Sequence, residues 1–486
     1  MTARAIMLQG TGSDVGKSLL VAGLCRIAKR RGINVAPFKP QNMSNNAAAC
    51  PSGGEIGRAQ ALQARAAGLD PTTDMNPVLL KPEGDRRSQI ILNGTPLRSE
   101  EAANYMRDRG SLLPEVLSAF ERLRAAHDLV VVEGAGSPAE VNLRQGDIAN
   151  MGFARAADVP VILIGDIDRG GVIAAVVGTK AVIGPGDAAM ISGFAINRFR
   201  GDPALFEDGV TFTEDRTGWP CLGVVPWLPC ASRLPAEDAV VLERRAATSN
   251  DIIIAVPMLS RISNFDDLDP LRAEEDVEVR FIPPGTPIPR DADAIILSGT
   301  KSTLSDLAML REQGWDHDII ASVRTGAHLV GICGGFQMLG TRIEDPDGLD
   351  GPAGGSNALG LLDMATIMTG EKIVRPMKAA SIKGQVPLSG YEIHTGRSEG
   401  PALDRPFSTL DDGTPDGAFA NGGQIIGTYL HGLFASDAFR ASWLVGLRSG
   451  RASALSYEEG VEAALDELAD GLEEALDIEA ILAMAR

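Results

Sequence analysis

A glycine-rich turn directly after the first apolar segment is the feature that most constrains the fold of this chain. The run Ala5-Ile-Met-Leu8 leads into Gln9-Gly-Thr-Gly-Ser-Asp-Val-Gly-Lys-Ser18, and a helical pattern follows. A strand, a tight turn and a helix in immediate succession are typical of the edge of a parallel sheet, where backbone N–H groups at a helix start converge on phosphate oxygens. The sequence therefore predicts an α/β fold that begins with a phosphate loop.

We expect this loop to bind the phosphates of ATP through Gly10, Thr11, Gly12, Ser13, Asp14, Val15, Gly16, Lys17 and Ser18. Lys17 supplies a positive charge for the terminal phosphates, and the Ser18 hydroxyl is a ligand for Mg²⁺. The spacing is one residue longer than the strict form, because Thr11 stands five residues before Gly16 and the nearest matching glycine is Gly10. This extension resembles the loop of the dethiobiotin synthetase family. The alternative is a glycine-rich turn without a ligand.

Two further apolar runs end in acidic residues. Asp128-Leu-Val-Val-Val-Glu133 predicts a buried parallel strand that delivers Glu133 to the Mg²⁺ of the nucleotide. The strand predicted at 159–164 is followed by Asp166, Asp168 and Arg169, which we place at the same carboxyl edge, where open α/β sheets bind their ligands. Charged loop residues without a ligand are the alternative.

Cys333 is the candidate nucleophile of a second site. In the run Leu329-Val-Gly-Ile-Cys-Gly-Gly-Phe-Gln337 an apolar strand leads a single thiol into a glycine turn. This pattern is typical of a nucleophile elbow, whose sharp turn requires residues that tolerate positive φ and exposes the side chain at its apex. Free N–H groups and a helix N-terminus at such a turn favour a thiolate and hold an oxyanion. The alternative is a buried cysteine that serves as a small hydrophobic residue.

A cysteine nucleophile needs a base, and the chain has five histidines. His431 is the best candidate, because it ends the strand-like run 424–431 and precedes Gly432. His394 is the reserve. The other histidines occupy polar or pre-strand positions that suit structural roles, namely His127, His317 and His328.

The runs Gly-Ile-Cys-Gly-Gly-Phe-Gln and Tyr-Leu-His-Gly together resemble the class I glutamine amidotransferase family. The resemblance implies glutamine hydrolysis through a cysteinyl thioester, with oxyanion and glutamine contacts from Gly299 and Gly334. Most members carry a glutamate two residues after the histidine, whereas this chain has Leu433. That departure matches the subgroup that includes cobyric acid synthases and leaves open which group orients His431. Glu392 is a candidate.

Three segments rich in amides and small polar residues lie between the phosphate loop and Glu133, at 41–46, 54–60 and 75–82. They indicate either a site for a large amide-bearing ligand or solvated loops. With Glu133-Gly-Ala-Gly-Ser-Pro-Ala-Glu140 and Asp166-Ile-Asp-Arg-Gly-Gly171, they resemble the cobyric acid synthase family over nearly the whole chain.

This resemblance implies an enzyme of cobalamin biosynthesis. Its members use ATP, Mg²⁺ and glutamine to amidate the b, d, e and g carboxylates of adenosylcobyrinic acid a,c-diamide. Candidates for contacts with the corrinoid are Gln41, Asn42, Ser44, Asn45, Asp166 and Arg169. The alternatives are an enzyme of the related cobyrinic acid a,c-diamide synthase type and a partition-type ATPase switch, which has no use for a glutaminase. A second domain that only binds, with Cys333 inert, is a further alternative.

Composition limits the remaining possibilities. The formal net charge of −19 argues against nonspecific binding to nucleic acid or to an anionic membrane. No apolar stretch approaches the roughly 20 residues of a membrane span, and the N-terminus lacks a signal-peptide pattern. The five cysteines form no disulfide or zinc framework, which predicts a cytoplasmic protein.

The 486 residues are enough for two or three domains. We expect an ATP-binding, dethiobiotin-synthetase-like parallel-sheet domain at 1–232 and a class I glutamine amidotransferase-like α/β domain at 251–448. A helical C-terminal tail at 449–486 completes the chain, because Ala, Leu and Glu recur there at helical spacing. The sequence leaves the oligomeric state open, with a homo-oligomer as one alternative.

Overall fold

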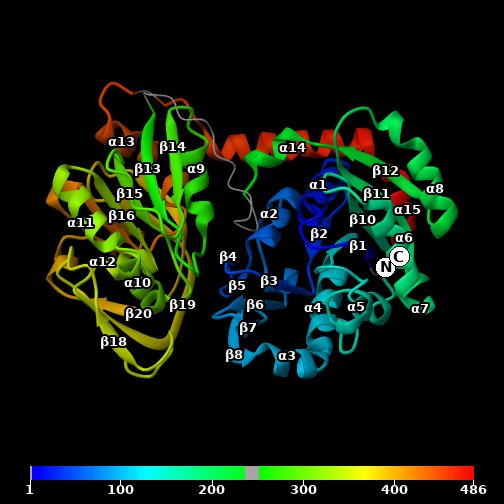
Figure 1. The fold of residues 1–486 in the computed structure, drawn as a ribbon, viewed down its shortest axis with the longest axis horizontal. Helices are drawn as coiled ribbons and strands as arrows, with labels where there is room; N and C mark the ends of the chain where they lie inside the picture. Colours follow the sequence, from blue (N-terminus) through cyan, green and yellow to red (C-terminus); the bar gives the residue numbers. More distant parts are fainter. Residues whose placement is uncertain (1–2, 236–250, 452) are drawn as a thin grey trace. The chain divides into compact units, whose positions relative to one another are not determined.

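The computed structural model describes residues 3–235, 251–451 and 453–486 (Figure 1). These residues divide into two compact units. The first holds residues 3–44, 54–235 and 461–486, and the second holds 45–53, 251–451 and 453–460. A short segment from the N-terminal part of the chain, 45–53, thus belongs to the second unit.

A parallel sheet forms the centre of the first unit. Its strands run in the order β12 (Cys221–Pro226), β11 (Ile191–Phe199), β10 (Val161–Asp166), β1 (Arg4–Gly10), β9 (Leu129–Glu133) and β2 (Val35–Phe38). Every residue of β9 is buried, as is every residue of β1 except the first. Strands of a parallel sheet that is covered on both faces read as unbroken apolar runs for this reason. The carboxyl ends of β1 and β9 meet at one edge, where Leu8 pairs with Glu133.

Helices pack around this sheet and around a separate, smaller sheet of the same unit. The helices are α1 (Lys17–Arg30), α2 (Arg58–Ala67), α3 (Ala102–Asp108), α4 (Leu113–Ala126), α5 (Met151–Ala156), α6 (Val172–Val182), α7 (Pro185–Ala188) and α8 (Glu207–Thr217). The smaller sheet has the order β3 (Gln41–Met43), β6 (Val78–Pro82), β7 (Arg87–Leu92) and β8 (Thr95–Glu101), and β5 is Glu55–Gly57. Phe38, Phe120 and Phe153 join strand and helices in the core, with ring centroids 5.1 to 5.5 Å apart.

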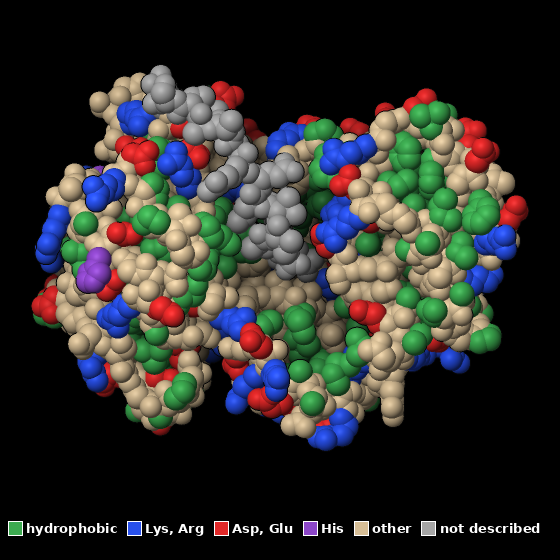
Figure 2. Space-filling view, in the orientation of Figure 1, with side chains coloured by type: hydrophobic (Ala, Val, Ile, Leu, Met, Phe, Trp, Pro, Cys, Tyr) green, Lys and Arg blue, Asp and Glu red, His purple; other side chains and the backbone are tan. Residues whose placement is uncertain are grey.

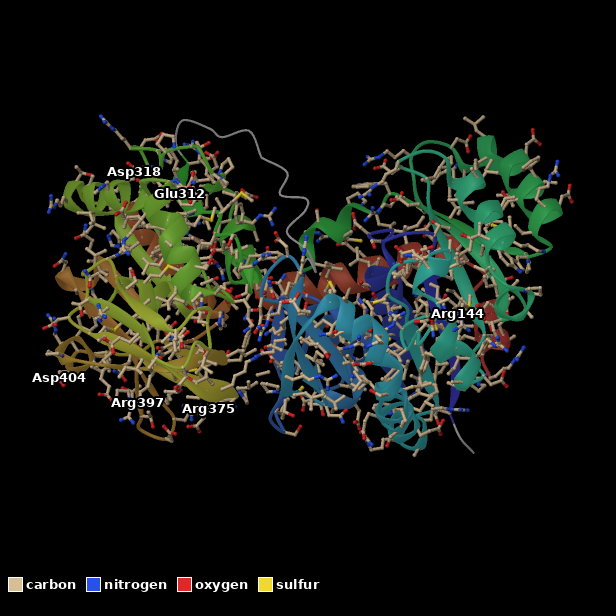
Figure 3. All side chains as sticks on the ribbon, turned by 60° about the horizontal axis from the view of Figure 1, so that its bottom comes forward. Arg144, Glu312, Asp318, Arg375, Arg397 and Asp404 are labelled. Carbon is tan, nitrogen blue, oxygen red and sulfur yellow. The ribbon has the colours of Figure 1, made fainter. Side chains whose placement is uncertain are left out.

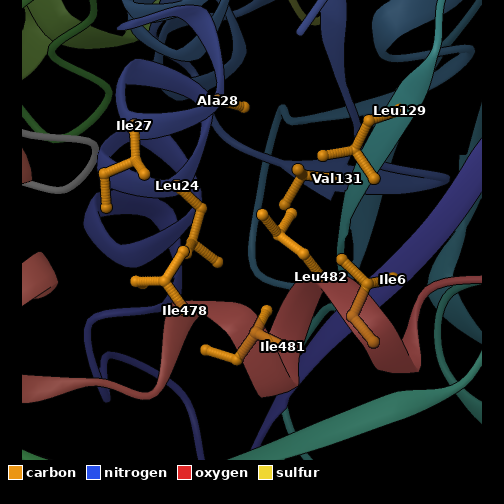
Figure 4. Close-up of a pocket in the computed structure, with 9 residues that line it drawn as sticks. All are labelled: Ile6, Leu24, Ile27, Ala28, Leu129, Val131, Ile478, Ile481 and Leu482. Carbon is orange, nitrogen blue, oxygen red and sulfur yellow. The ribbon is translucent and has the colours of Figure 1, made fainter. Parts of the chain in front are cut away.

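The C-terminal helices return to the first unit. From Val461 onward, α14 (Tyr457–Ala475) belongs to it, followed by α15 (Ile478–Met484). Ile478, Ile481 and Leu482 of α15 pack against residues of α1, β1 and β9, leaving a void of only about 10 Å³ (Figure 4). The expected helical tail is therefore part of the unit that contains the phosphate loop.

Arginines on α1 face carboxylates on α14. Arg26 contacts Asp466 at 2.8 Å and Glu462 at 2.9 Å, and its side chain is 9% exposed. Arg30 contacts Asp470 at 2.6 Å, with both side chains far more exposed. Because α1 begins with Lys17 and Ser18, these ion pairs tie the helix of the phosphate loop to the end of the chain.

Arg26→Ala should lower the free energy of unfolding by about 1 kcal/mol, because Asp466 loses its hydrogen-bonded cation whereas Glu462 keeps Arg65 at 2.7 Å. The Arg26 hydrogen bond also holds the pKa of Asp466 below its ordinary value. This stabilisation is present above the unfolded-state pKa near 3.8 and is lost as the pH falls through the folded-state pKa. Urea unfolding curves recorded at pH 7 and at acid pH measure the free energy of unfolding and so both effects. Arg30→Ala, the exposed control, should change the midpoint little.

The second unit has its own mainly parallel sheet. The strand order is β14 (Val277–Ile282), β13 (Ile252–Pro257), β15 (Ala294–Leu297), β16 (His328–Ile332), β24 (Ile425–Thr428) and β23 (Ala418–Ala420), with β23 antiparallel to β24. Alternate residues of these strands enter different cores, so that Ile295 and Leu297 join Trp315 whereas Ala294 and Ile296 join Cys333. The helices are α9 (Asp269–Arg272), α10 (Thr303–Glu312), α11 (Trp315–Thr325), α12 (Gly334–Leu339) and α13 (Asp437–Leu447).

A long hairpin dominates the second sheet of this unit. β19 (Ala365–Ser381) pairs with β20 (Pro387–Glu399), and β4 (Ala47–Ala49) lies beside them. The rest of the sheet has the order β18 (Gly354–Asn357), β17 (Arg342–Asp345), β19, β21 (Ser408–Leu410) and β22 (Pro415–Asp416). The expected α/β class is confirmed in both units.

The surface carries charges of both signs. Figure 2 shows Lys and Arg side chains interspersed with Asp and Glu on the visible face of each unit.

Among the helices of the described residues, none combines the length and the apolar character that crossing a membrane requires.

Candidate active sites

The loop after β1 has the backbone of a phosphate cradle. Asp14 and Gly16 adopt positive φ values of 54° and 90°, and α1 begins directly after Gly16. A Cβ atom on Gly16 would lie 2.3 Å from the amide nitrogen of Asn197, so only glycine fits there. Lys17 is buried, and its Nζ donates to the carbonyl of Gly12 at 3.0 Å. The sequence motif thus folds with its lysine lying across the loop.

Glu133, at the end of β9, is the central carboxylate of this site. Its side chain is 1% exposed, and its Oε1 accepts hydrogen bonds from Ser18 Oγ and Lys39 Nζ, both at 2.8 Å. Its Oε2 accepts one from Gln63 Nε2 at 2.6 Å. The structure therefore brings together the expected pair, Ser18 and Glu133, and adds Lys39 and Gln63, to which the sequence analysis gave no role at the metal.

The residues at the expected Mg²⁺ site fit an ion that takes most of its ligands from phosphates and waters. The described residues contain no cluster of three or more His, Cys, Asp or Glu side chains that could hold a metal ion by itself. A hydroxyl and one carboxylate are hard oxygen ligands, and Mg²⁺ in nucleotide sites takes one or two such ligands together with phosphates and waters. Ser18 and Glu133 fit this role.

Asp166 and Arg169, two of the candidates for corrinoid contacts, lie in an ionic network with Asp14 of the phosphate loop. Arg169 contacts Asp14 at 2.7 Å. Arg198 contacts Asp14 at 3.3 Å and Asp166 at 2.9 Å, so that it links the two carboxylates. These two candidates therefore lie beside the loop. Arg198 follows no motif that the sequence analysis singled out.

The remaining candidates for corrinoid contacts come from one segment whose residues have different neighbours. Gln41 accepts from the Tyr105 hydroxyl at 2.6 Å, and Asn42 donates to Gln60 at 2.9 Å. The Ser44 N–H donates to the carbonyl of Leu80 at 3.0 Å. These three residues belong to the first unit, whereas Asn45 belongs to the second, where its Oδ1 is buried without a hydrogen-bond partner among the described residues.

Cys333 stands at a strained turn between β16 and α12. Its φ of 54° and ψ of −111° lie in a region that side chains rarely adopt. We expected the following glycines to supply positive φ and the thiol to be exposed. Instead Cys333 itself adopts the positive φ, and its side chain is buried, with 6% of its surface exposed. Gly335 is required for another reason, because a Cβ atom there would lie 1.9 Å from the carbonyl oxygen of Leu297 in β15.

His431 lies beside this thiol and is held by Asp267. Its Nδ1 is 2.7 Å from Asp267 Oδ2, and Asp267 Oδ1 accepts from the N–H of Gly432 at 2.6 Å. Both side chains are almost fully buried. Burial alone would lower the pKa of His431, but the Asp267 carboxylate, together with Cys333, raises it to about 10. The imidazolium form is therefore strongly favoured, and a Cys–His–Asp triad results.

Asp267 is the residue that sequence reasoning missed. The candidate Glu392 was wrong as the group that orients His431, because the register of β19 and β20 places it opposite Arg375, which it contacts at 2.6 Å. Asp267 lies 164 residues before His431, in a polar and aromatic segment after β13. The available signal was the pair of adjacent acids Asp266 and Asp267 in the segment that follows β13.

The reserve base His394 has another environment. Its ring stacks on Tyr429 with centroids 3.8 Å apart, and burial lowers its pKa to about 4. It is therefore neutral at ordinary pH and is not paired with a carboxylate as His431 is.

The two glycines expected at the oxyanion lie against the triad. A Cβ atom on Gly299 would be 3.0 Å from Cε1 of His431. One on Gly334 would be 2.7 Å from the side chain of Thr300 and 3.2 Å from its backbone nitrogen. The loop after β15 and the turn at Cys333 are thus packed together, so that Cys333, His431, Gly299 and Gly334 form one site.

A cavity of about 470 Å³ lies next to this site, within the second unit. Phe336, His394 and Tyr429 are among its lining residues, and the Cys333 thiol donates to the carbonyl of Ile393, the neighbour of His394, at 3.4 Å. Arg375 of β19 and Arg397 of β20 also line it (Figure 3). The cavity therefore combines apolar walls with two guanidinium groups and with the carboxylates of Glu371, Glu392 and Asp416.

A nucleotide-type loop and a glutaminase-type triad on one chain define a glutamine-dependent amidating ligase. Sequence comparisons agree: residues 6–241 match the CobQ/CobB/MinD/ParA nucleotide binding domain, and residues 253–439 match the CobB/CobQ-like glutamine amidotransferase domain. The chain belongs to the cobyric acid synthase family, a family of ATP-binding enzymes of cobalamin biosynthesis.

Relatives with this name match over the full length. The cobyric acid synthase of Hyphomonas neptunium is 64% identical over 486 residues, which cover 100% of this chain and 98% of the relative. That of Paracoccus denitrificans is 62% identical and covers 99% and 100%. A cobyric acid synthase of Rhodobacter capsulatus is 59% identical, also with coverage of 99% and 100%.

Asp267→Asn should lower the pKa of His431 well below 10, because it removes the charge that offsets burial. Histidine-labelled protein examined by NMR over a pH series measures this directly, since the chain has only five histidines. Asp269→Asn, in the same segment but paired with Arg272, is the matched control and should leave the titration of His431 unchanged. An unchanged titration in Asp267→Asn would contradict the assignment.

Cys333→Gly should be more stable than Cys333→Ala by about 1 kcal/mol, because glycine adopts the observed φ and ψ without strain. Equilibrium unfolding of the two variants in urea provides the comparison. Equal midpoints, or a more stable alanine variant, would show that the turn relaxes when the thiol is removed.

Proposed function

We propose that this chain converts adenosylcobyrinic acid a,c-diamide to adenosylcobyric acid by amidating its b, d, e and g carboxylates. The observation that carries the proposal is the presence of two complete sites on one chain. One is the Ser18–Glu133 pair at a phosphate loop, and the other is the triad Cys333–His431–Asp267. The names of the full-length relatives identify the product class.

The first step activates the carboxylate, because hydroxide is a poor leaving group. A substrate carboxylate oxygen attacks the γ-phosphorus of ATP, which gives an acyl phosphate and ADP. Lys17 and Lys39 offset the negative charge that spreads over the transferred phosphoryl oxygens. When bound, Mg²⁺ held by Ser18 and Glu133 supplies further charge neutralisation at the phosphates. Glu133 also holds Lys39 in place, since the two groups are 2.8 Å apart and both are buried.

The second step releases ammonia from glutamine. The Cys333 thiolate attacks the side-chain amide carbon, and backbone N–H groups near Gly299 and Gly334 stabilise the oxyanion. His431, kept protonated by Asp267, gives its proton to the leaving nitrogen. A thioester and ammonia result, and water then hydrolyses the thioester to glutamate and restores the thiol. Ammonia attacks the acyl phosphate, which expels phosphate and leaves the amide.

We place the amino acid part of glutamine in the cavity beside Cys333. Glutamine carries a carboxylate, and guanidinium groups bind carboxylates well. Arg375 and Arg397 line the cavity. Both arginines have a carboxylate partner, since Arg375 contacts the buried Glu392 at 2.6 Å and Arg397 contacts Glu399 at 2.9 Å. Arg397 is the better candidate because its ion pair is exposed on both sides and is therefore the weaker one.

We propose that the polar segment at 41–45 contacts the corrinoid. Gln41, Asn42 and Ser44 lie in the unit that contains the phosphate loop, as a substrate of phosphoryl transfer requires. We assign Asp166 and Arg169 to the phosphate loop instead, because both join the network around Asp14.

Mass spectrometry tests the reaction. The enzyme is incubated with the a,c-diamide, ATP and Mg²⁺, with either glutamine or ammonia as nitrogen source. Each conversion replaces OH with NH₂, so the wild type should show one small mass decrease for each of the b, d, e and g positions. Cys333→Ala should lose the glutamine-supported reaction by about three orders of magnitude and keep the ammonia-supported one.

Glu133→Gln is the complementary variant. It should abolish amidation with both nitrogen sources and leave glutaminase activity intact, because Glu133 belongs to the other unit. No mass change in the wild type with either nitrogen source would overturn the corrinoid assignment. Conversion of cobyrinic acid at the a and c positions only would favour a synthase of the a,c-diamide type.

A further inference from the structure

The segment that carries Asp267 is held by a residue from the N-terminal part of the chain. The Asn264 N–H donates to Asn46 Oδ1 at 2.7 Å, and the Ala47 N–H donates to Asn264 Oδ1 at 3.0 Å. Each asparagine thus accepts a hydrogen bond from the backbone of the other segment. Asn46 and Asn264 are both buried, at 5% and 3% exposure. We call this reciprocal pair the asparagine clamp.

The clamp lies three residues from the triad. Asn264 has a left-handed backbone with φ 52° and ψ 41°, and it stands directly before the 3₁₀ turn at Phe265–Leu268. Its carbonyl accepts a hydrogen bond from the N–H of Asp267 at 3.1 Å. The side chain of Asp267 then reaches His431 Nδ1 and the N–H of Gly432. The position of Asn264 therefore fixes the start of the turn that aims Asp267.

The same segment also supports the loop expected at the oxyanion. The N–H of Ser263 donates to the carbonyl of Gly299 at 2.8 Å, and Ile262 forms a bridge with Thr300. A shift of the segment would thus move both the carboxylate behind His431 and the loop beside it. Geometry in such sites matters at the level of fractions of an ångström.

We propose that Asn46 and Asn264 are positioning residues of the glutaminase site, which hold Asp267 against His431. This inference rests on the proposed function. It also places a role in the glutaminase site directly after the proposed corrinoid segment at 41–45, since Gln41, Asn42 and Ser44 precede Asn46 closely in the chain. A residue that follows the proposed corrinoid segment would then set the alignment of the groups that release ammonia.

Single and double variants of the clamp test the proposal. Asn46→Ala removes the acceptor for the Asn264 N–H, and Asn264→Gly removes the other acceptor while it tolerates the left-handed backbone. Each should lower kcat/KM for glutamine hydrolysis by about tenfold. The double variant should lose much less than the product of the two single effects, because both bonds serve the same contact.

Conservative variants separate positioning from folding. Asn46→Gln and Asn264→Gln each keep a neutral amide oxygen that accepts a backbone N–H without burying a new charge, so both should restore part of the activity. The alkaline limb of the glutaminase pH profile should move to lower pH in Asn46→Ala and Asn264→Gly, because a displaced Asp267 no longer keeps His431 protonated. The other titratable groups at His431 are Cys333, the neutral His394 and Tyr391, whose ring stacks on the imidazole with centroids 5.2 Å apart, and none of them changes in Asn46→Ala or Asn264→Gly.

Ammonia-supported amidation keeps this test distinct from that of the proposed function. It should remain at the wild-type level in every clamp variant. Loss of stability with an unchanged kcat/KM and an unchanged pH profile would overturn the positioning role. If the wild type itself showed no ammonia-supported amidation, the proposed function would be refuted. The glutaminase measurements on the clamp variants would still decide the positioning role.

Discussion

A buried carboxylate must be matched by donors, and both sites of this protein are arranged around one such group. Glu133 is held by a hydroxyl, an ammonium and an amide. Asp267 is held by an imidazole and a backbone N–H. Leaving either carboxylate without partners in an apolar interior would cost several kcal/mol. The need to satisfy it therefore fixes the neighbouring catalytic groups, Ser18 and Lys39 in one unit and His431 in the other.

Much of this arrangement could be predicted because it is local in sequence. A strand, a turn and a helix in immediate succession place Lys17, Ser18 and Cys333, and the end of an apolar run places Glu133. His431 was found among five candidates by its position after a strand-like run, although the strand itself ends at Thr428. The carboxylate partner of His431 is not local. Asp267 comes from a segment 164 residues away, and nothing in the spacing of the sequence joins the two.

The register of the β19–β20 hairpin explains why the prediction for Glu392 was wrong. Glu392 and Ile393 are neighbours in β20, yet Glu392 faces Arg375 across the hairpin while the carbonyl of Ile393 accepts from the Cys333 thiol. A shift of one residue would exchange their faces, and the sequence does not reveal the register of so long a hairpin. The backbone strain at Cys333 was equally hidden, because two adjacent glycines offered a simpler way to make the turn.

The position of the C-terminal helices has a consequence for how the chain folds during synthesis. Residues 461–486 complete the first unit, where Arg486 and Ala5 exchange backbone hydrogen bonds at the edge of β1. These residues are synthesised after every part of the second unit. All residues of the second unit are therefore synthesised while the apolar face of α1 and β1 still lacks its cover. The first unit is thus completed only by residues that emerge after the whole of the second unit, so a chain that stops near residue 460 would hold a complete second unit and an incomplete first one.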